Sequence, residues 1–238
     1  SFEAKIYFFH IHSIYFREKG EIEASYYYCE KLVALFESFP HKIKKEPRQY
    51  IAALSNLLLC QEELKKTDAF LNTIHKLRTM PEKSKDIQSR IFANSFLQEL
   101  RMYIRTGQFE RGISIIQDIE KGLQKYQGRI GSALQLNMYY YISCIWFGAD
   151  NYSKSLHWLN KLLNLFKTEQ RKDMYSFAKI LNLIVHYELG NDDLLSYIVR
   201  STYRFLYGRN RLYKFENVVL DFIEKKTPNL TTRQKLIE

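Results

Sequence analysis

The 238-residue chain contains few of the residues that make tight turns or interrupt helices, with only 9 glycines and 4 prolines. An all-β sandwich or barrel needs many tight turns and is therefore disfavoured, so helices are expected throughout. The prolines, Pro40, Pro47, Pro81 and Pro228, all fall between segments with helical apolar periodicity. A fixed φ and a missing N–H donor do least harm there, so these prolines mark connections between helices.

The chain also lacks long hydrophobic runs and paired cysteines. No apolar run reaches the roughly 18 to 20 residues that a membrane-spanning helix needs. Its three cysteines, Cys29, Cys60 and Cys144, lie inside apolar helical segments, which favours buried thiols in a reducing compartment. We therefore expect a cytoplasmic protein without a membrane span. Because the chain begins with Ser1 and not Met, it is expected to be a fragment, and a signal peptide or further domain before Ser1 stays open.

Positive charge exceeds negative charge. The chain has 36 Lys and Arg against 26 Asp and Glu, a net charge of +10 and a pI near 9.3. Such a surface favours acidic peptides, nucleic acid or anionic lipid over basic partners, although net charge also serves solubility alone. With 46% hydrophobic residues, the chain can bury a substantial core.

What the sequence does contain is a repeat of two apolar-periodic segments joined by a short polar turn. The turns are expected at Gly20, Lys65, Gly107, Asp150 and Gly190, which are 45, 42, 43 and 40 residues apart. Glycine takes a positive φ without a steric clash, and Asp tolerates it. A near-constant interval is typical of a solenoid in which each repeat covers the apolar face of its neighbour. The predicted repeats span about 4–40, 47–80, 84–126, 130–168 and 171–207, with a terminal helix over 211–226.

Within the repeats, one helical face carries large, large, small and large side chains in that order. The clearest examples are Tyr139, Ile142, Ser143 and Trp146, and Phe9, His12, Ser13 and Phe16. This order and the turns "GEIEAS", "GQFERG" and "DNYSKS" resemble the tetratricopeptide repeat over about residues 4–207. The closing stretch "LLSYIVRSTYRFLYGRNRLYKFE" is similar to the ends of uncharacterised bacterial repeat proteins. The resemblance implies an all-α fold, a right-handed α-solenoid of about five hairpins plus a C-terminal helix. The interval is longer than the family's usual 34 residues or so.

The sequence carries none of the common catalytic or metal-binding motifs. It has no Gly-rich phosphate loop, HExxH, GxSxG or CxxC. The two histidines of "HIH" at 10–12 would share a face on a strand, but on a helix they point apart. We therefore predict a protein that is not an enzyme and that has no cofactor and no metal site.

Amide side chains recur at equal distances from the turns. Asn94 and Asn137 each lie 13 residues before their turn, and Asn56 and Gln98 each lie nine before theirs. The resemblance implies that the first helices line an inner groove, where amides can bond an extended peptide backbone. Solvated helix polarity is the alternative. The predicted peptide-binding groove comprises Asn56, Asn94, Gln98, Arg101, Arg105, Asn137 and Tyr141.

A second candidate surface lies near the C-terminus, where no acidic residue occurs between Leu194 and Phe215. Basic groups beside aromatic rings suit single-stranded nucleic acid, through phosphate pairing and base stacking. They equally suit an acidic helix, and a terminal helical pair with its aromatics inside would look the same. This basic-aromatic patch comprises Arg200, Tyr203, Arg204, Tyr207, Arg209, Arg211 and Lys214.

These patterns predict a non-catalytic scaffold that binds another protein or an acidic peptide in the groove of a helical repeat array. Three alternatives stay open. The chain could be the sensing part of a transcriptional regulator whose DNA-binding domain lies outside it, a nucleic-acid-binding repeat protein, or a purely structural assembly module. The partner's identity, the oligomeric state and the pathway do not follow from the sequence.

Overall fold

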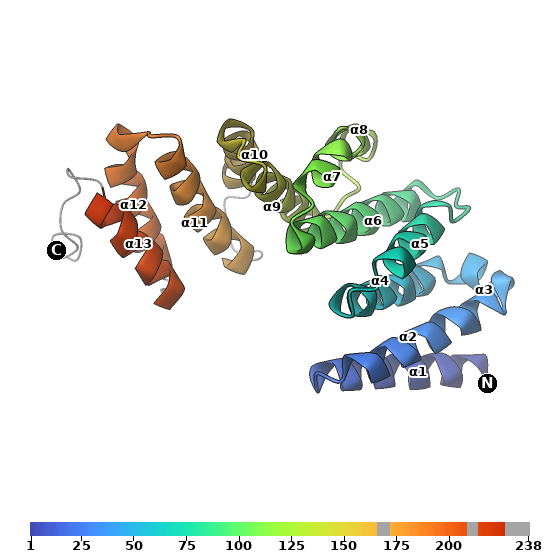
Figure 1. The fold of residues 1–238 in the computed structure, drawn as a ribbon. Coiled ribbons are helices and arrows are strands. Elements are labelled where there is room, and N and C mark those ends of the chain that lie inside the picture. The colour runs from blue at the N-terminus through green and yellow to red at the C-terminus, as the bar shows by residue number, and fades with distance from the viewer. Residues whose placement is uncertain (166–171, 209–213, 227–238) are drawn as a thin grey trace. The chain divides into compact units, whose positions relative to one another are not determined.

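The computed structural model describes residues 1–165, 172–208 and 214–226, which form helices joined by turns, with no strand among them (Figure 1). The predicted all-α fold is confirmed. The chain divides into two compact units. The N-terminal unit consists of Ser1–Met102 and Gln117–Ile130, and the C-terminal unit consists of Tyr103–Ile116 and the described residues from Gly131 onward.

The N-terminal unit is built from antiparallel helical pairs. Its helices are α1 (Phe2–Glu18), α2 (Ile22–Glu37), α3 (Pro40–Lys45), α4 (Pro47–Glu63), α5 (Thr67–Arg78), most of α6 (Lys85–Thr106), and α8 (Ile116–Lys125). Helix α1 packs on α2, α2 on α4, and α4 on α5, while the short α3 contacts both α2 and α4. From α1 to α5, each helix therefore packs on its neighbours in the chain.

The C-terminal unit continues the same pairing. Its helices are α7 (Phe109–Ser114), α9 (Ser132–Gly148), α10 (Tyr152–Leu165), α11 (Lys172–Glu188), α12 (Asp192–Tyr207) and α13 (Lys214–Lys226). Helix α7 packs on α9, α9 on α10, α10 on α11, and α11 on α12. Helix α13 contacts both α11 and α12, so it covers the last helical pair.

The five predicted turns share one backbone conformation. The residues at the turn positions, Gly20, Lys65, Gly107, Asp150 and Gly190, have φ values of 77°, 56°, 68°, 55° and 66°. In each turn the next residue donates its N–H to the carbonyl five residues back, as Glu21 does to Phe16 at 2.9 Å. This is the Schellman pattern, which ends a helix and satisfies its last carbonyls. The left-handed conformation expected at Gly20, Gly107, Asp150 and Gly190 is confirmed, and Lys65, near which a turn without glycine is expected, has it too.

Small residues lie where the two helices of a hairpin meet. The Ser25 hydroxyl donates to the Ser13 carbonyl at 2.7 Å, and the Ser155 hydroxyl donates to the Ser143 carbonyl at 2.9 Å. Ser13 and Ser143 each lie seven residues before a turn, and their partners lie five residues after it. The hairpins that turn at Gly20 and Asp150 therefore contain the same buried hydrogen bond between helices. In the third repeat Gly112 takes the position five after the turn, and a Cβ there would collide with Ile145 of α9.

The second helix of the third repeat differs from expectation. The apolar pattern predicts one helix that continues through Ile119, but the helix is interrupted at Ile115 and divides into α7 and α8. Glycine and the β-branched isoleucines of "GISII", residues 112–116, are weak helix formers, which accounts for a break at this point. The two pieces pack in different units.

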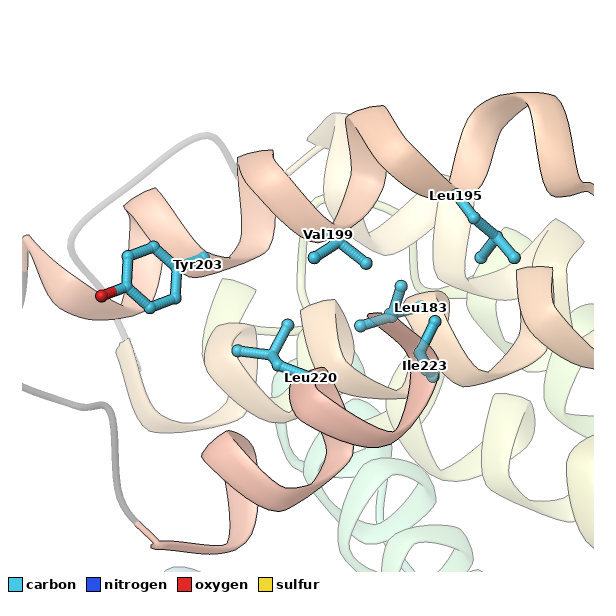
Figure 2. Packing of buried hydrophobic residues seen from close by; sticks show 6 residues of the cluster. All are labelled: Leu183, Leu195, Val199, Tyr203, Leu220 and Ile223. Carbon is cyan, nitrogen blue, oxygen red and sulfur yellow. The ribbon is translucent and has the colours of Figure 1, made fainter. Parts of the chain in front are cut away.

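The last three helices enclose a cluster of apolar side chains. It consists of Leu183 from α11, Leu195, Val199 and Tyr203 from α12, and Leu220 and Ile223 from α13 (Figure 2). Leu183 and Leu195 occupy the positions seven before and five after their turn, which serines occupy in the first and fourth repeats. Each buried leucine or isoleucine contributes about 1.5 to 3 kcal/mol, so this cluster holds α13 on the last pair.

The left-handed turns predict opposite effects for one substitution at two lysines. Lys65→Gly should raise the free energy of unfolding by about 0.5 to 1 kcal/mol, because a side chain in the left-handed region costs about 1 to 2 kcal/mol and glycine's extra chain entropy offsets only part of this. Lys19→Gly is the matched control, since Lys19 has a right-handed φ of −79°, and it should lower stability. Urea denaturation measures both, and a loss of stability in both variants would contradict the strain at Lys65.

Candidate ligand-binding surfaces

A hollow of about 740 Å³ lies in the N-terminal unit, beside the connections between successive hairpins. Its wall comes from α3, the start of α4, the end of α5 and the segment that follows α5. Its volume falls within the roughly 300 to 1,000 Å³ typical of ligand pockets. The lining residues are Pro40, Ile43, Lys44, Pro47, Tyr50, Lys76, Thr79, Met80, Pro81, Glu82 and Lys83.

Proline gives the hollow much of its apolar wall. Pro40 and Pro47 are the first residues of α3 and α4, where the missing N–H would have had no helical partner. Pro81 lies in the connection after α5, next to Met80. The prolines that mark connections in the sequence therefore supply a rigid apolar surface. Because proline has no backbone N–H, this surface exposes few hydrogen-bond donors.

Lysines dominate the charge of the hollow. Lys76 Nζ lies 2.6 Å from Glu37 Oε1, and the Tyr50 hydroxyl donates to the same oxygen at 2.9 Å. Burial, followed by this hydrogen bond, raises the pKa of Tyr50, which keeps the phenol protonated as a donor. Within the described residues, Lys44 and Lys83 have no ion pair.

The one acidic residue of the lining is occupied by its own turn. Glu82 Oε1 accepts the backbone N–H groups of Lys83 and Ser84, both at 2.7 Å. The carboxylate therefore faces its own backbone, while the ammonium groups of Lys44 and Lys83 remain available to an anionic ligand.

A smaller hollow of about 330 Å³ adjoins the first and shares Met80 and Glu82 with it. Aromatic rings of Phe92, Phe96 and Tyr126 form part of its wall. The Arg78 guanidinium lies 3.9 Å from the centre of the Phe96 ring. The two hollows thus lie on either side of the segment 80–82. Together they offer an extended ligand an apolar surface with basic groups along it.

The predicted groove residues are divided between the two units. Asn56 on α4 and Asn94, Gln98 and Arg101 on α6 belong to the N-terminal unit, while Arg105 at the end of α6, and Asn137 and Tyr141 on α9, belong to the C-terminal unit. Asn94 Nδ2 donates to the Arg90 carbonyl of its own helix at 2.8 Å. Gln98 Oε1 and Asn137 Oδ1 are buried and accept no hydrogen bond from the described residues. Because both oxygens are buried, neither is exposed to a peptide in this structure.

Arg101, one of the predicted groove residues, is paired with a residue of another helix. Its Nε donates to Glu62 Oε2 of α4 at 2.8 Å, and its Nη2 contacts the same oxygen. The Glu62 side chain is only 3% exposed, so the guanidinium already neutralises a buried carboxylate. A parallel pair joins α6 to α5, where Arg78 Nη2 lies 2.6 Å from Glu99 Oε2. Two partly buried ion pairs, each with a buried carboxylate, therefore tie α6 to both helices of the preceding hairpin.

Removing Arg101 should destabilise the N-terminal unit. Arg101→Ala leaves the Glu62 carboxylate buried without its ion-pair partner, which typically costs about 3 to 5 kcal/mol. Arg48→Ala is the matched control, because Arg48 pairs with Asp86 at 2.8 Å between the same two helices but in an exposed position, and its loss should be much smaller. Urea denaturation of both variants tests this expectation. If both variants lost the same free energy of unfolding, the burial of Glu62 would not explain the contribution of the Arg101–Glu62 pair to stability.

The basic-aromatic patch is only partly exposed. Arg200 and Arg204 are exposed on α12. Tyr203 is 7% exposed in the cluster with α13, whereas Tyr207 is 62% exposed and stacks on Tyr203 at 5.8 Å between ring centres. Arg209 and Arg211 lie outside the described residues, as does the side chain of Lys214 at the start of α13. Tyr207 therefore offers the exposed ring, and Tyr203 serves packing.

His12, Cys29 and Cys60 pack among their neighbours, whereas His41, His75 and His157 are exposed. In the part of the chain that the structure describes, no group of three or more His, Cys, Asp or Glu side chains could hold a metal ion. The His12 ring lies 4.0 Å from Phe8 and 5.0 Å from Tyr28, measured between ring centres. Cys29 and Cys60 are buried free thiols with their sulfurs 3.9 Å apart. None of the helices in the described ranges has the length and apolar character to cross a membrane.

Comparison with known proteins found no family model, no curated protein and no solved structure that matches this chain. Function must therefore be inferred from the chain's own surfaces. The sequence did not reveal the hollow, although one signal was present: prolines at 40, 47 and 81 alternate with lysines at 44, 76 and 83 around two successive connections. Only the folded hairpins bring these connections to one side of the unit.

Proposed function

We propose that the protein is a non-catalytic helical-repeat module that binds an acidic segment of another protein. The observation that best supports this is the hollow of the N-terminal unit, where an apolar wall is bordered by Lys44, Lys76 and Lys83. An acidic peptide with apolar side chains matches both features, because its carboxylates meet ammonium groups while its apolar groups leave water. The net charge of +10 favours the approach of such a ligand.

The proposed architecture is a right-handed α-solenoid of tetratricopeptide type. Recurrent Schellman turns, 40 to 45 residues apart, support it. So does the hydrogen bond shared by the Ser13–Ser25 and Ser143–Ser155 pairs. Modules of this kind bind ligands on surfaces that several repeats build together, and the hollow with its smaller neighbour is such a surface, since residues of α3 to α6 and the Tyr126 segment line it.

Nucleic acid is the second candidate ligand. Exposed Arg200 and Arg204, with the exposed ring of Tyr207, favour it, because phosphate pairing and base stacking need these groups. The hollow is preferred as the main site because it combines charge with an enclosed apolar wall. A sensing role within a transcriptional regulator would use the same peptide-binding surface.

A double charge reversal in the hollow should weaken peptide binding. The probes are fluorescein-labelled nonapeptides that combine Glu or Asp with Leu or Phe, and their Gln or Asn counterparts serve as neutral controls. Lys44→Glu with Lys83→Glu should raise the dissociation constant of the acidic probes by about tenfold or more, since each lost hydrogen bond to a charged group contributes about 1.5 to 3 kcal/mol when fully formed. Fluorescence anisotropy measures the affinity.

The control variant carries Lys45→Glu and Lys85→Glu, at exposed positions next to or near the hollow that do not line it. It changes the net charge equally, so its affinity should stay within about threefold of the native chain if local contacts matter. If both variants bound the acidic probes equally weakly, the loss of affinity would be due to the net charge of the chain and not to contacts in the hollow. If Arg200→Glu with Arg204→Glu abolished binding while the lysine variants retained it, the site would be the C-terminal patch.

A further inference from the structure

Two cysteine thiols meet in the core of the N-terminal unit, where α2 of the first hairpin packs on α4 of the second. Cys29 lies in α2 and Cys60 lies near the end of α4, and each residue is 1% exposed. Their sulfurs are 3.9 Å apart, and both cysteines are free thiols. Successive hairpins therefore bring together two groups that can be oxidised with each other.

The packing of the hairpins does not require a thiol at either position. Cys29 lies nine residues after the turn at Gly20, and Cys60 lies five residues before the turn at Lys65. The residues nine after the other turns are Ile74, Ile116, Leu159 and Val199, and those five before the three later turns are Met102, Ile145 and Val185. All seven are at most 5% exposed. Since other apolar side chains fill the same positions elsewhere, the two cysteines add a chemical property that packing does not need.

The surroundings of the thiols give them different roles. Ser25 Oγ lies 3.3 Å from Cys60 Sγ, and the Ser25 hydroxyl also donates to the Ser13 carbonyl at 2.7 Å. When Cys60 is ionised, the Cys29 thiol donates a hydrogen bond to its sulfur. This hydrogen bond lowers the pKa of Cys60 and raises that of Cys29; burial opposes the ionisation of Cys60, and the positive charge of Arg17 favours it. Because the thiolate is the nucleophile, Cys60 is the residue that attacks an oxidant.

The two sulfurs can be joined while α2 and α4 stay packed on each other. A disulfide bond is about 2.05 Å long, so the sulfurs need to approach each other by about 2 Å. Rotation about the Cα–Cβ bonds, between staggered side-chain conformations, moves each sulfur through such a distance. The bond therefore requires a change of side-chain rotamer and no separation of the helices.

From the distance between the sulfurs, their register and their polar neighbours we infer that Cys29 and Cys60 are a site of reversible oxidation, at which a peroxide joins α2 to α4 by a disulfide. The Cys60 thiolate attacks one oxygen of hydrogen peroxide and becomes a sulfenic acid, and the departing hydroxide takes up the proton that Cys60 lost. The Cys29 sulfur then attacks the Cys60 sulfur, and the hydroxyl group leaves with the Cys29 proton as water. In total, two thiols and one peroxide give one disulfide and two water molecules.

Burial determines which oxidants reach the site. Because both cysteines are almost fully buried, an oxidant has to enter during brief local openings of the hairpins. Hydrogen peroxide is small enough to do so, whereas a bulky disulfide such as oxidised glutathione is excluded from the thiolate. The product closes the segment 29–60 into a covalent loop, which restricts the unfolded chain. Oxidation should therefore stabilise the first two hairpins.

The inference goes beyond the proposed peptide site, because neither cysteine lines the hollow. The two proposals are tested by different measurements, one by the number of free thiols and the other by the affinity for labelled peptides. Failure of one therefore leaves the other standing.

Thiol counting on the 238-residue chain tests the disulfide. After treatment with hydrogen peroxide, the chain is alkylated with iodoacetamide in urea, and its mass is measured. The reduced chain should take up iodoacetamide at all three cysteines, and the oxidised chain at Cys144 alone. Peptide mapping without reductant should find Cys29 linked to Cys60, and dithiothreitol should restore all three thiols. Disulfide formation should be about tenfold or more faster with peroxide than with the same concentration of oxidised glutathione, since access limits the larger oxidant.

Serine variants separate the two roles. Cys29→Ser should form no intramolecular disulfide, and its Cys60 sulfenic acid should be trapped by dimedone. Cys144→Ser is the matched control and should still form the disulfide. Peroxide should raise the urea concentration at the midpoint of unfolding in the native chain and in Cys144→Ser, but not in Cys29→Ser.

The mapping on the native chain decides the result even where a variant does not fold. Three free thiols after peroxide, a disulfide that includes Cys144, or linkage only between separate chains would each overturn the inference. Equal rates with peroxide and oxidised glutathione would also contradict it, because they would show a site that is open to large oxidants.

Discussion

One residue in the left-handed conformation sets the geometry of each hairpin. At Gly20, Lys65, Gly107, Asp150 and Gly190 the chain turns by the same Schellman pattern, and this fixes which residues of the two helices meet. The residue seven positions before the turn residue then faces the residue five positions after it. The packing of the two apolar stripes on each other depends on that register. A different turn would rotate the second helix and move its apolar stripe away from the first. The two buried serine pairs and the Leu183–Leu195 pair lie at this crossing because the turn places them there.

Polar groups within the apolar faces restrict which helices pair. Glu62 and Glu99 interrupt the apolar surface of α4 and α6, and each is matched by an arginine on a neighbouring helix. A carboxylate buried without such a partner would be costly, so these helices have a strong preference for one arrangement. The same chemistry removes Arg101 from the set of freely available cations. Gln98 and Asn137 differ from Arg101 in their pairing, because their buried side-chain oxygens accept no hydrogen bond from the described residues.

The proposed binding surface arises where the repeat pattern is interrupted. The hollow lies at the connections between hairpins, where prolines form part of its wall and lysines border it. Such a surface combines apolar area with exposure, which is what association with another chain requires. Cys29 and Cys60 lie instead at a regular contact between hairpins, where α2 packs on α4.

The helical fold, the five turns and the apolar stripes could be predicted from the residues alone, because these depend on local conformational preference and on periodicity along one helix. Gly107 and the spacing of Ser143 from Ser155 carry that information without any knowledge of the rest of the chain. Contacts between distant parts of the chain could not be predicted in this way. Pairing of Arg101 with Glu62, burial of Tyr203 under α13 and the grouping of Lys44 with Lys83 each join residues that are far apart in the chain. The break at Ile115 separates α7 from α8, and the two pack in different units. Such contacts depend on how hairpins stack, and the spacing of residues along one helix does not specify them.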